Sequence, residues 1–163
     1  SIGRIQEQKR QLDVLKFLDS FRKVDRNFLC YFVGGPSGKS GDDYLIQLKN
    51  AVKEFNLESN VDFLGNLTQL KIKELMNRSK LLIHTSHFET FGLVAIEANS
   101  MGVPVLTTNQ GSLSELIENN VNGYLTEELT NSQVNNFVQN LLNDEKQFHK
   151  FQMNCHEKSK KFD

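Results

Sequence analysis

The chain has 163 residues, of which 38% are hydrophobic and 24% charged, and its formal net charge is −1. This composition suits one domain with a hydrophobic core and excludes wholesale disorder. The near-zero charge offers no basic surface for nucleic acid or acidic membranes, although a few local cations could still bind a small anion. Cys30 and Cys155 lack the spacing of metal or redox sites. A reduced, cytoplasmic setting is the simplest expectation.

Short apolar segments alternate along the chain with segments that repeat apolar residues at helical spacing. In chain order, the pattern predicts a helix over 8–24, a strand over 28–33, a helix over 42–56, a strand over 61–64, a helix over 68–78 and a strand over 80–85. After these come a helix over 91–101, a strand over 103–107, a short helix near 113–118, a strand over 123–125 and two further helices. Ser1-Ile2 resembles the end of another strand, as expected of a domain taken from a longer protein.

The alternation predicts an α/β fold whose parallel sheet is covered by helices on both faces. The sequence contains no internal repeat and no low-complexity linker, so we expect a single domain over 1–163. Ligands of such sheets bind beyond the carboxyl ends of the strands. The loops that follow the strands are 3–9, 34–41, 65–68, 86–91 and 108–112.

The loop at 34–41 raises the question of an ATP site, because Gly38-Lys39-Ser40 follows an apolar strand. A phosphate-binding P-loop places four residues between its first glycine and the Gly-Lys-Ser/Thr triplet. Gly34 leaves only three, and Pro36 supplies no N–H to the cradle. There is also no suitable acidic strand end for Mg²⁺. A P-loop ATPase is therefore disfavoured.

Glu89 and Glu97 lie eight residues apart, and such a pair often consists of two solvated carboxylates on a helix surface. Glu97, however, lies in an otherwise apolar stretch, where a charge needs a partner. Eight residues of helix span about 12 Å, more than the roughly 5–9.5 Å between the carboxylates of a glycosidase. The pair suits the two ends of one elongated ligand. Between them, the amides at 91–93 open a helix and could bind an anion.

The stretch FETFGLVAIEANSMGVPVLTTNQGSLSELIENNVNGYL strongly resembles retaining, family 4-like glycosyltransferases of the GT-B fold. It contains, in order, the family's Glu-x7-Glu pair, a Gly-x-Pro-Val strand, a Gly…Glu segment and an Asn-Gly turn. GRIQEQK matches the Gly-Arg…Lys segment of the nucleotide-binding half, so the resemblance extends from Gly3 to Phe162. It implies a Rossmann-like, three-layer α/β/α domain, the C-terminal half of a GT-B enzyme, whose N-terminal acceptor domain is absent.

The resemblance also implies residue roles. Arg4 and Lys9 would neutralise the donor diphosphate, Glu97 would accept hydrogen bonds from the ribose hydroxyls, and Glu89 would face the donor sugar. Arg4, Lys9 and Glu89 are thus the expected catalytic residues. The full donor-binding set implied is Gly3, Arg4, Lys9, Gly34, Asn66, Leu67, Glu89, Thr90, Phe91, Gly92, Leu93 and Glu97.

The reaction implied is transfer of a sugar, with retained configuration, from a nucleoside diphosphate sugar to an acceptor hydroxyl of a glycan or lipid. No cofactor or metal is expected, because cations of the chain would stabilise the leaving diphosphate, and no nucleic acid is expected as a partner. The setting would be cytoplasmic, with contact to the inner membrane face through the other half. A nucleotide-binding module that regulates without transferring sugar is the alternative.

Some residues depart from the family or allow two interpretations. Arg10 stands where a glycine is common after the lysine, which could alter that loop. Asn99 stands where the family favours small residues, and we expect an effect on packing only. His84 is expected to be a core residue of a strand, whereas His87 could reach the sugar. Ser86 is expected to cap the end of its strand.

Overall fold

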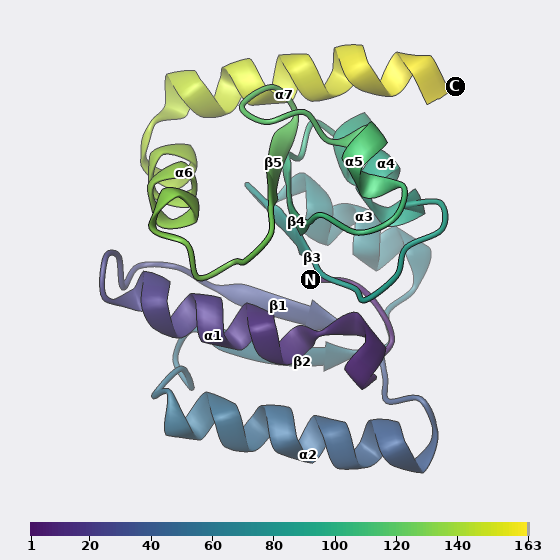
Figure 1. Cartoon of the computed structure of the whole chain (residues 1–163), viewed down its shortest axis with the longest axis vertical. Helices are drawn as coiled ribbons and strands as arrows, with labels where there is room; N and C mark the ends of the chain where they lie inside the picture. The colour runs from purple at the N-terminus through teal and green to yellow at the C-terminus, as the bar shows by residue number, and fades with distance from the viewer. Residues whose placement is uncertain (163) are drawn as a thin grey trace.

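The computed structural model describes residues 1–162, which form an α/β domain of alternating strands and helices (Figure 1). The strands are β1 (Cys30–Val33), β2 (Val61–Gly65), β3 (Leu82–His84), β4 (Val105–Thr108) and β5 (Gly123–Thr126). The α-helices are α1 (Gln11–Arg22), α2 (Gly38–Glu54), α3 (Gln69–Asn77), α4 (Leu93–Ser100), α5 (Leu113–Leu116), α6 (Ser132–Asn143) and α7 (Glu145–Ser159). Two 3-10 turns complete the list, η1 (Glu7–Lys9) and η2 (Lys160–Phe162). The expected order of elements is confirmed.

The strands pair only in parallel, as expected, but they form two sheets where one was predicted. β1 pairs with β2, and β3, β4 and β5 form the second sheet in that order. The residues before η1 lie between the two sheets, where Ile2 forms an isolated parallel bridge with Val33 of β1. Residues 1–3 thus extend the first sheet toward the second, without forming a full strand.

Alternate residues of the second sheet point into two separate hydrophobic clusters. Ile83 and Leu106 belong to the cluster that contains the buried side chains of α1, α2, α6 and α7. Their neighbours Leu82 and Val105 belong to the cluster built with α3, α4 and α5. Because successive strand residues face opposite sides of a sheet, helices cover both faces, which confirms the layered arrangement expected from the sequence.

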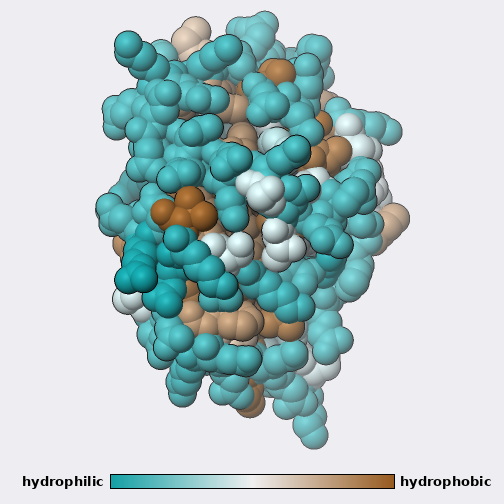
Figure 2. Space-filling model, turned by 60° about the vertical axis from the view of Figure 1, so that its left-hand side comes forward, coloured by the Kyte–Doolittle hydropathy of each residue, from teal (hydrophilic) through white to brown (hydrophobic). Residues whose placement is uncertain are grey.

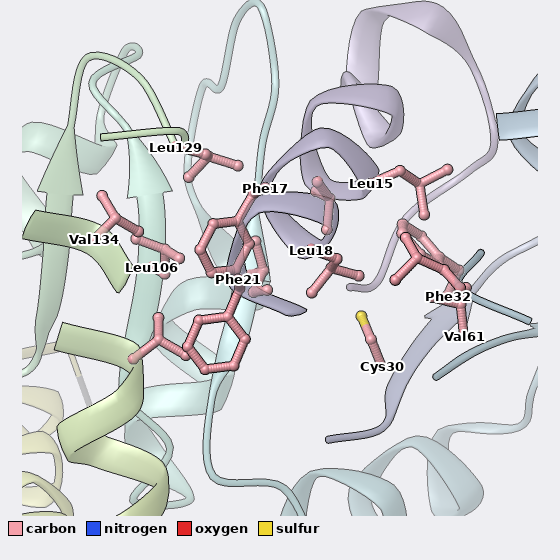
Figure 3. Packing of buried hydrophobic residues seen from close by; sticks show 14 of the residues in the cluster. Leu15, Phe17, Leu18, Phe21, Cys30, Phe32, Val61, Leu106, Leu129 and Val134 are labelled. Carbon is pink, nitrogen blue, oxygen red and sulfur yellow. The ribbon is translucent and has the colours of Figure 1, made fainter. Parts of the chain in front are cut away.

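Helix α1 packs against both sheets. Figure 3 shows Phe17 and Phe21 turned toward Leu106 of β4, and Leu18 turned toward Cys30 of β1. The rings of Phe17 and Phe21 stack with their centroids 5.7 Å apart. The side chains of Phe17, Leu18 and Phe21 are at most 3% exposed, so α1 carries much of the apolar contact between the sheets.

The surface is mostly polar, and on the face shown in Figure 2 the hydrophobic residues form small, separate patches. The C-terminal helices contribute to the core, since Phe151 of α7 is buried and meets the ring of Phe137 edge-on. Phe148 packs partly buried against the same cluster. Phe162 of η2, by contrast, is substantially exposed.

Asn99 does more than pack, contrary to the expectation for its position. Its side-chain amide donates to the carbonyl oxygens of Val103 and Asn122, and its oxygen accepts from Asn122 Nδ2 at 2.6 Å. Both asparagines are buried. The pair therefore ties the end of α4 to the turn before β5 and helps to satisfy the buried carbonyl groups there.

Candidate functional site

Two loops that are far apart in the sequence meet at the carboxyl ends of the strands. Lys9 Nζ lies 3.5 Å from Glu89 Oε2, across eighty residues of sequence. The residues after β3 hold this contact in place, because the Thr85 hydroxyl donates to the Lys9 carbonyl at 2.7 Å and the His87 amide donates to the Gln8 carbonyl at 2.8 Å. A cation and a carboxylate are thereby fixed side by side at the carboxyl ends of the strands.

The Glu89 carboxylate has two further partners. Its Oε2 lies 3.0 Å from His84 Nε2, and its Oε1 accepts a hydrogen bond from the Gly92 amide at 3.3 Å. Since an ionised carboxylate can only accept, His84 must carry its proton on Nε2. The His84 side chain is 5% exposed and that of Glu89 is 17% exposed. Glu89 is therefore oriented from three sides, by β3, by α4 and by the Lys9 loop.

Burial and this network shift the pKa values of both residues downward. Burial lowers the pKa of His84 below its ordinary 6.5, and the hydrogen bond to Glu89 only partly opposes this. For Glu89, burial would raise the pKa, but the hydrogen bond from His84 and the charge of Lys9 bring it below the ordinary 4.5. At neutral pH the pair is thus a neutral imidazole that donates to an ionised carboxylate, and Lys9 is the cation that faces the carboxylate.

Two glycines allow the backbone around Glu89 to pack closely. Gly111, in the loop after β4, has φ of +57°, and a Cβ there would lie 2.0 Å from the Glu89 carbonyl oxygen. Gly92 has φ of +63°, and its Cβ would lie 2.5 Å from Leu116 Cδ1. The Ser112 amide also donates to the Glu89 carbonyl at 3.2 Å. The loop after β4 therefore fixes the main chain of Glu89, while His84 fixes its side chain.

Three loops, two of which contain glycines, contact one another beside Lys9. The Gly3 amide donates to the Val33 carbonyl at 2.9 Å, and a Cβ on Gly34 would lie 2.0 Å from the Gly3 carbonyl oxygen. Asn66, which follows β2, accepts from the Gly35 amide through Oδ1 at 2.9 Å. The loops that contain Gly3, Gly34 and Asn66 are thus in direct contact with one another.

The same contacts answer the question of the Gly38-Lys39-Ser40 segment. Three amides of the loop before α2 are already paired, since Gly34 donates to the Gly65 carbonyl, Gly35 to Asn66 and Ser37 to the Ile5 carbonyl. The chain at residues 3–5 runs beside this loop in parallel, with a bridge between Ile5 and Pro36. Lys39 is exposed in the first turn of α2. These contacts, like the spacing in the sequence, argue against a P-loop.

The start of α4 differs in two respects from the expectation. The Gly92 amide, expected to be free for a phosphate, donates to Glu89 instead. The helix begins at Leu93, later than predicted, and the first-turn amides of a helix have no partner within the helix. Thr90, Phe91 and Leu93 are exposed beside this end. An anion-binding role thus rests on the amides that follow Gly92.

Glu97 does not need the buried partner that its apolar neighbours suggested. Its side chain is exposed, one helical turn after the exposed Leu93, on the outer face of α4. The apolar residues Ala95 and Ala98 face the core instead. The α4 sequence is apolar on both faces, and this is why the pattern around Glu97 indicated burial. The Glu97 carboxylate is therefore accessible from solvent.

The remaining candidate residues lie as follows. Arg4 is exposed, its carbonyl accepts from the Gln11 side chain, and it forms no ion pair within residues 1–162. Leu67 is half-buried in the loop after β2. His84 is a buried residue of β3, as expected, but sequence analysis did not foresee its contact with Glu89, for which the spacing of five across the strand end was a usable signal. One further residue beside the candidate site was missed. Gly111 was not singled out, although it belongs to the family's Gly…Glu segment.

The described part of the chain shows neither of two other kinds of site. No group of three His, Cys, Asp or Glu side chains within residues 1–162 is arranged to hold a metal ion. None of the helices in this range is both long and apolar enough to span a bilayer. The site at the strand ends consists instead of loops, one ion pair, a buried histidine and a helix N-terminus.

An α/β domain with this cluster of loops is typical of nucleotide-binding proteins. Residues 1–162 match the family model of the glycosyl transferases group 1, and the chain belongs to this family. It is 34% identical over 129 residues to the D-inositol 3-phosphate glycosyltransferase of Gordonia bronchialis, a match that covers 76% of the chain and 28% of the relative. It is 35% identical over 127 residues to the N-acetyl-alpha-D-glucosaminyl L-malate synthase of Bacillus anthracis, which covers 77% of the chain and 31% of that protein.

Solved structures agree with this assignment. Anabaena HepE (Alr3699), crystallised with UDP and glucose, superposes with a TM-score of 0.86 at 26% identity, over 98% of the chain and 42% of HepE. The C-terminal domain of a Francisella tularensis group 1 glycosyltransferase (LpcC) has the same fold, with a TM-score of 0.85 over 98% of the chain and 83% of that domain. The fold is therefore that of a Rossmann-like C-terminal domain of GT-B glycosyltransferases. The chain spans about a third or less of the two curated relatives named above.

Proposed function

We propose that this chain is the donor-binding half of a retaining glycosyltransferase, which transfers a sugar from a nucleoside diphosphate sugar to an acceptor hydroxyl. The acceptor, a glycan or lipid, would be held by an N-terminal domain. The observation that carries the proposal is the Lys9–Glu89–His84 cluster at the carboxyl ends of the strands. Membership of the family and the complex of HepE with UDP and glucose support it.

Each group of residues would contact a different part of the elongated donor. The exposed Glu97 would accept hydrogen bonds from the two ribose hydroxyls, and the loop of Asn66 and Leu67 would border the base. Arg4, Lys9 and the amides that open α4 would hold the diphosphate. These positive groups would stabilise the charge that develops on the leaving diphosphate, which is the step that this half can assist directly. The oriented Glu89 would face the sugar.

The setting of the reaction belongs to the same proposal. Synthesis of a glycan, a cell-surface polysaccharide or a glycolipid would take place in the cytoplasm, with contact to the inner membrane face made by the other half. A domain that binds nucleotides without supporting transfer is the competing function. The two functions make different predictions for the full-length protein. Sugar transfer would require Glu89 and Lys9 for turnover, whereas a purely regulatory module would not affect turnover through them.

The proposal is tested by calorimetric titration of the chain with UDP, GDP and ADP. We expect one of them to bind, and Lys9→Ala to weaken that binding clearly through loss of a phosphate contact. Lys39→Ala is the control, because Lys39 is an exposed lysine in the first turn of α2, just after the loop that follows β1, and it should leave the affinity nearly unchanged. A stronger effect of Lys39→Ala would place the phosphate at the 34–41 loop and overturn the proposed site.

A further inference from the structure

The loop of residues 4–10 carries Arg4 and Lys9, the two cations of the proposed donor site. The Lys9 end of the loop is fixed from β3, because the Thr85 hydroxyl donates to the Lys9 carbonyl. The Arg4 end has a different anchor. The side chain of Gln11, the first residue of α1, donates through Nε2 to the Arg4 carbonyl at 2.9 Å. This bond joins the two ends of the loop.

Gln11 occupies a position of α1 that faces the core. Val14, Leu15 and Leu18, which are buried, follow it at the spacing of a single helix face. Gln11 itself is only 2% exposed. An apolar side chain would suit this position, so burial alone does not account for the polar amide.

The Gln11 amide has a partner on one side only. A carbonyl oxygen can only accept a hydrogen bond, so the amide presents Nε2 to Arg4 and turns Oε1 away. Within residues 1–162, Oε1 is buried and accepts no hydrogen bond. A buried acceptor without a partner lowers stability. The bond to Arg4 is thus made by a side chain that is unfavourable for stability at its other polar atom.

The peptide unit that follows Arg4 is held on both sides. Its N–H, which belongs to Ile5, donates to the Gly35 carbonyl at 2.8 Å, and its carbonyl accepts from Gln11. Among the hydrogen bonds of residues 1–162, the bond from Gln11 is the only one that involves an atom of Arg4. The Arg4 side chain is exposed and forms no ion pair in this range. Gln11 therefore constrains the backbone from which a free guanidinium extends.

We propose that Gln11 is a positioning residue for the donor site. By holding the Arg4 carbonyl, it fixes the direction in which the Arg4 side chain leaves the backbone, so that the guanidinium meets the diphosphate together with Lys9. Gln11 is buried and would not touch the donor itself. The inference rests on the proposed function, since Arg4 must bind the donor diphosphate for its position to matter. A cation held in place binds better than one that must first be ordered.

Gln11→Met tests the proposal, because it removes both polar atoms and keeps an unbranched side chain of similar length. Calorimetry with UDP, GDP and ADP identifies the nucleotide that binds best, and we expect the variant to bind it about fivefold more weakly. Its Tm should be unchanged or higher, since the unpartnered Oε1 is lost as well.

Tyr44→Phe is the matched control. The Tyr44 hydroxyl accepts from the Leu12 amide at 3.0 Å, so it anchors the same end of α1 without contact to Arg4. Its loss should lower Tm and leave the affinity within about twofold of the natural chain, because this bond does not hold the Arg4 backbone.

Double variants separate positioning from a general loosening of the loop. Arg4→Ala should weaken binding about tenfold in the natural chain, and less than about threefold in the Gln11→Met chain, where the guanidinium is already misplaced. Lys9→Ala should have the same effect in both chains, because Thr85 holds Lys9 independently of Gln11.

The outcomes distinguish this inference from the proposed function. If no nucleotide binds, or if Arg4→Ala leaves the affinity of the natural chain unchanged, the proposed role of Arg4 fails and the inference fails with it. If Arg4→Ala weakens binding and Gln11→Met does not, the donor site stands and the inference is overturned. An equal effect of Arg4→Ala in both chains, or loss of the Lys9→Ala effect in the Gln11→Met chain, would overturn it too. Gln11→Leu repeats the comparison if the Met variant folds poorly.

Discussion

Glu97 is the residue whose role the proposed donor site defines most sharply. A carboxylate that accepts two hydrogen bonds from ribose hydroxyls contributes about 1.5–3 kcal/mol, as hydrogen bonds to charged groups do. Glu97→Gln should therefore weaken nucleoside diphosphate binding about tenfold or more and leave the fold intact, since the side chain is exposed. Calorimetry measures the affinity, and Glu54→Gln, also exposed but at the far end of α2, is the control. Unchanged affinity would remove Glu97 from the site.

The His84–Glu89 pair gives stability a dependence on pH. His84 is kept neutral in the folded protein, with its pKa below 6.5, whereas in the unfolded chain it takes up a proton near 6.5. The unfolded state thus binds more protons as pH falls below about 6.5, so stability is present above that pH and is lost below it. Glu89, whose pKa is also lowered, adds a second loss only at more acidic pH, below its ordinary 4.5.

Replacing the imidazole tests this assignment. Gln in place of His84 can still donate to Glu89 but does not titrate. Between pH 7 and pH 5.5 the free energy of unfolding of the natural chain should fall by up to about 1.4 kcal/mol per pH unit, and that of His84→Gln should fall less. Urea denaturation at each pH measures both. Parallel curves for the two chains would show that His84 titrates normally in the fold.

At the scale of elements, the loop after β4 fixes Glu89 through a glycine. Gly111→Ala places a methyl group 2.0 Å from the Glu89 carbonyl oxygen, at a φ that disfavours any side chain. We expect a loss of more than about 2 kcal/mol, because the backbone of one loop must move. Gly38→Ala is the matched control, with a similar φ of +65° and open space around it, and should cost only about 1–2 kcal/mol.

Urea denaturation compares the two variants, and nucleotide binding provides the second measurement. If the Glu89 main chain moves, Gly111→Ala should also lose affinity, whereas Gly38→Ala should not. Equal costs of the two substitutions would mean that the close contact between Gly111 and Glu89 is not rigid.

The sequence predicted the order and type of the elements well, because apolar strands and periodic helices leave local patterns. Arg10 stands where the family often has glycine. Its φ of +53° is left-handed, a backbone conformation that glycine adopts more readily than other residues. Contacts between residues far apart in the sequence were harder to predict. The exposure of Glu97 could not be read from α4, which is apolar on both faces, and the His84–Glu89 bond depends on how a loop folds back over a strand end. The break between the sheets has no local signal at all.

For the whole molecule, we expect this chain to bind a nucleotide sugar without transferring the sugar. The described residues supply candidate groups for the donor and none that we can assign to an acceptor. Placing an acceptor hydroxyl against the sugar carbon can supply about 7–11 kcal/mol of the barrier, which half a cleft cannot provide. Incubation with donor and acceptor should give no product above background. Turnover comparable to that of a full-length enzyme would contradict the division of labour between two halves.

The central claim is that the donor lies where the loops of Lys9, Asn66 and Glu89 meet the start of α4. Backbone amide chemical shifts, recorded while the best-binding nucleoside diphosphate is titrated into the ¹⁵N-labelled chain, test it most directly. The largest changes should fall at residues 3–9, 66–67 and 89–97, with small ones at 37–40. Changes centred on 37–40, with the 89–97 segment unaffected, would contradict the claim.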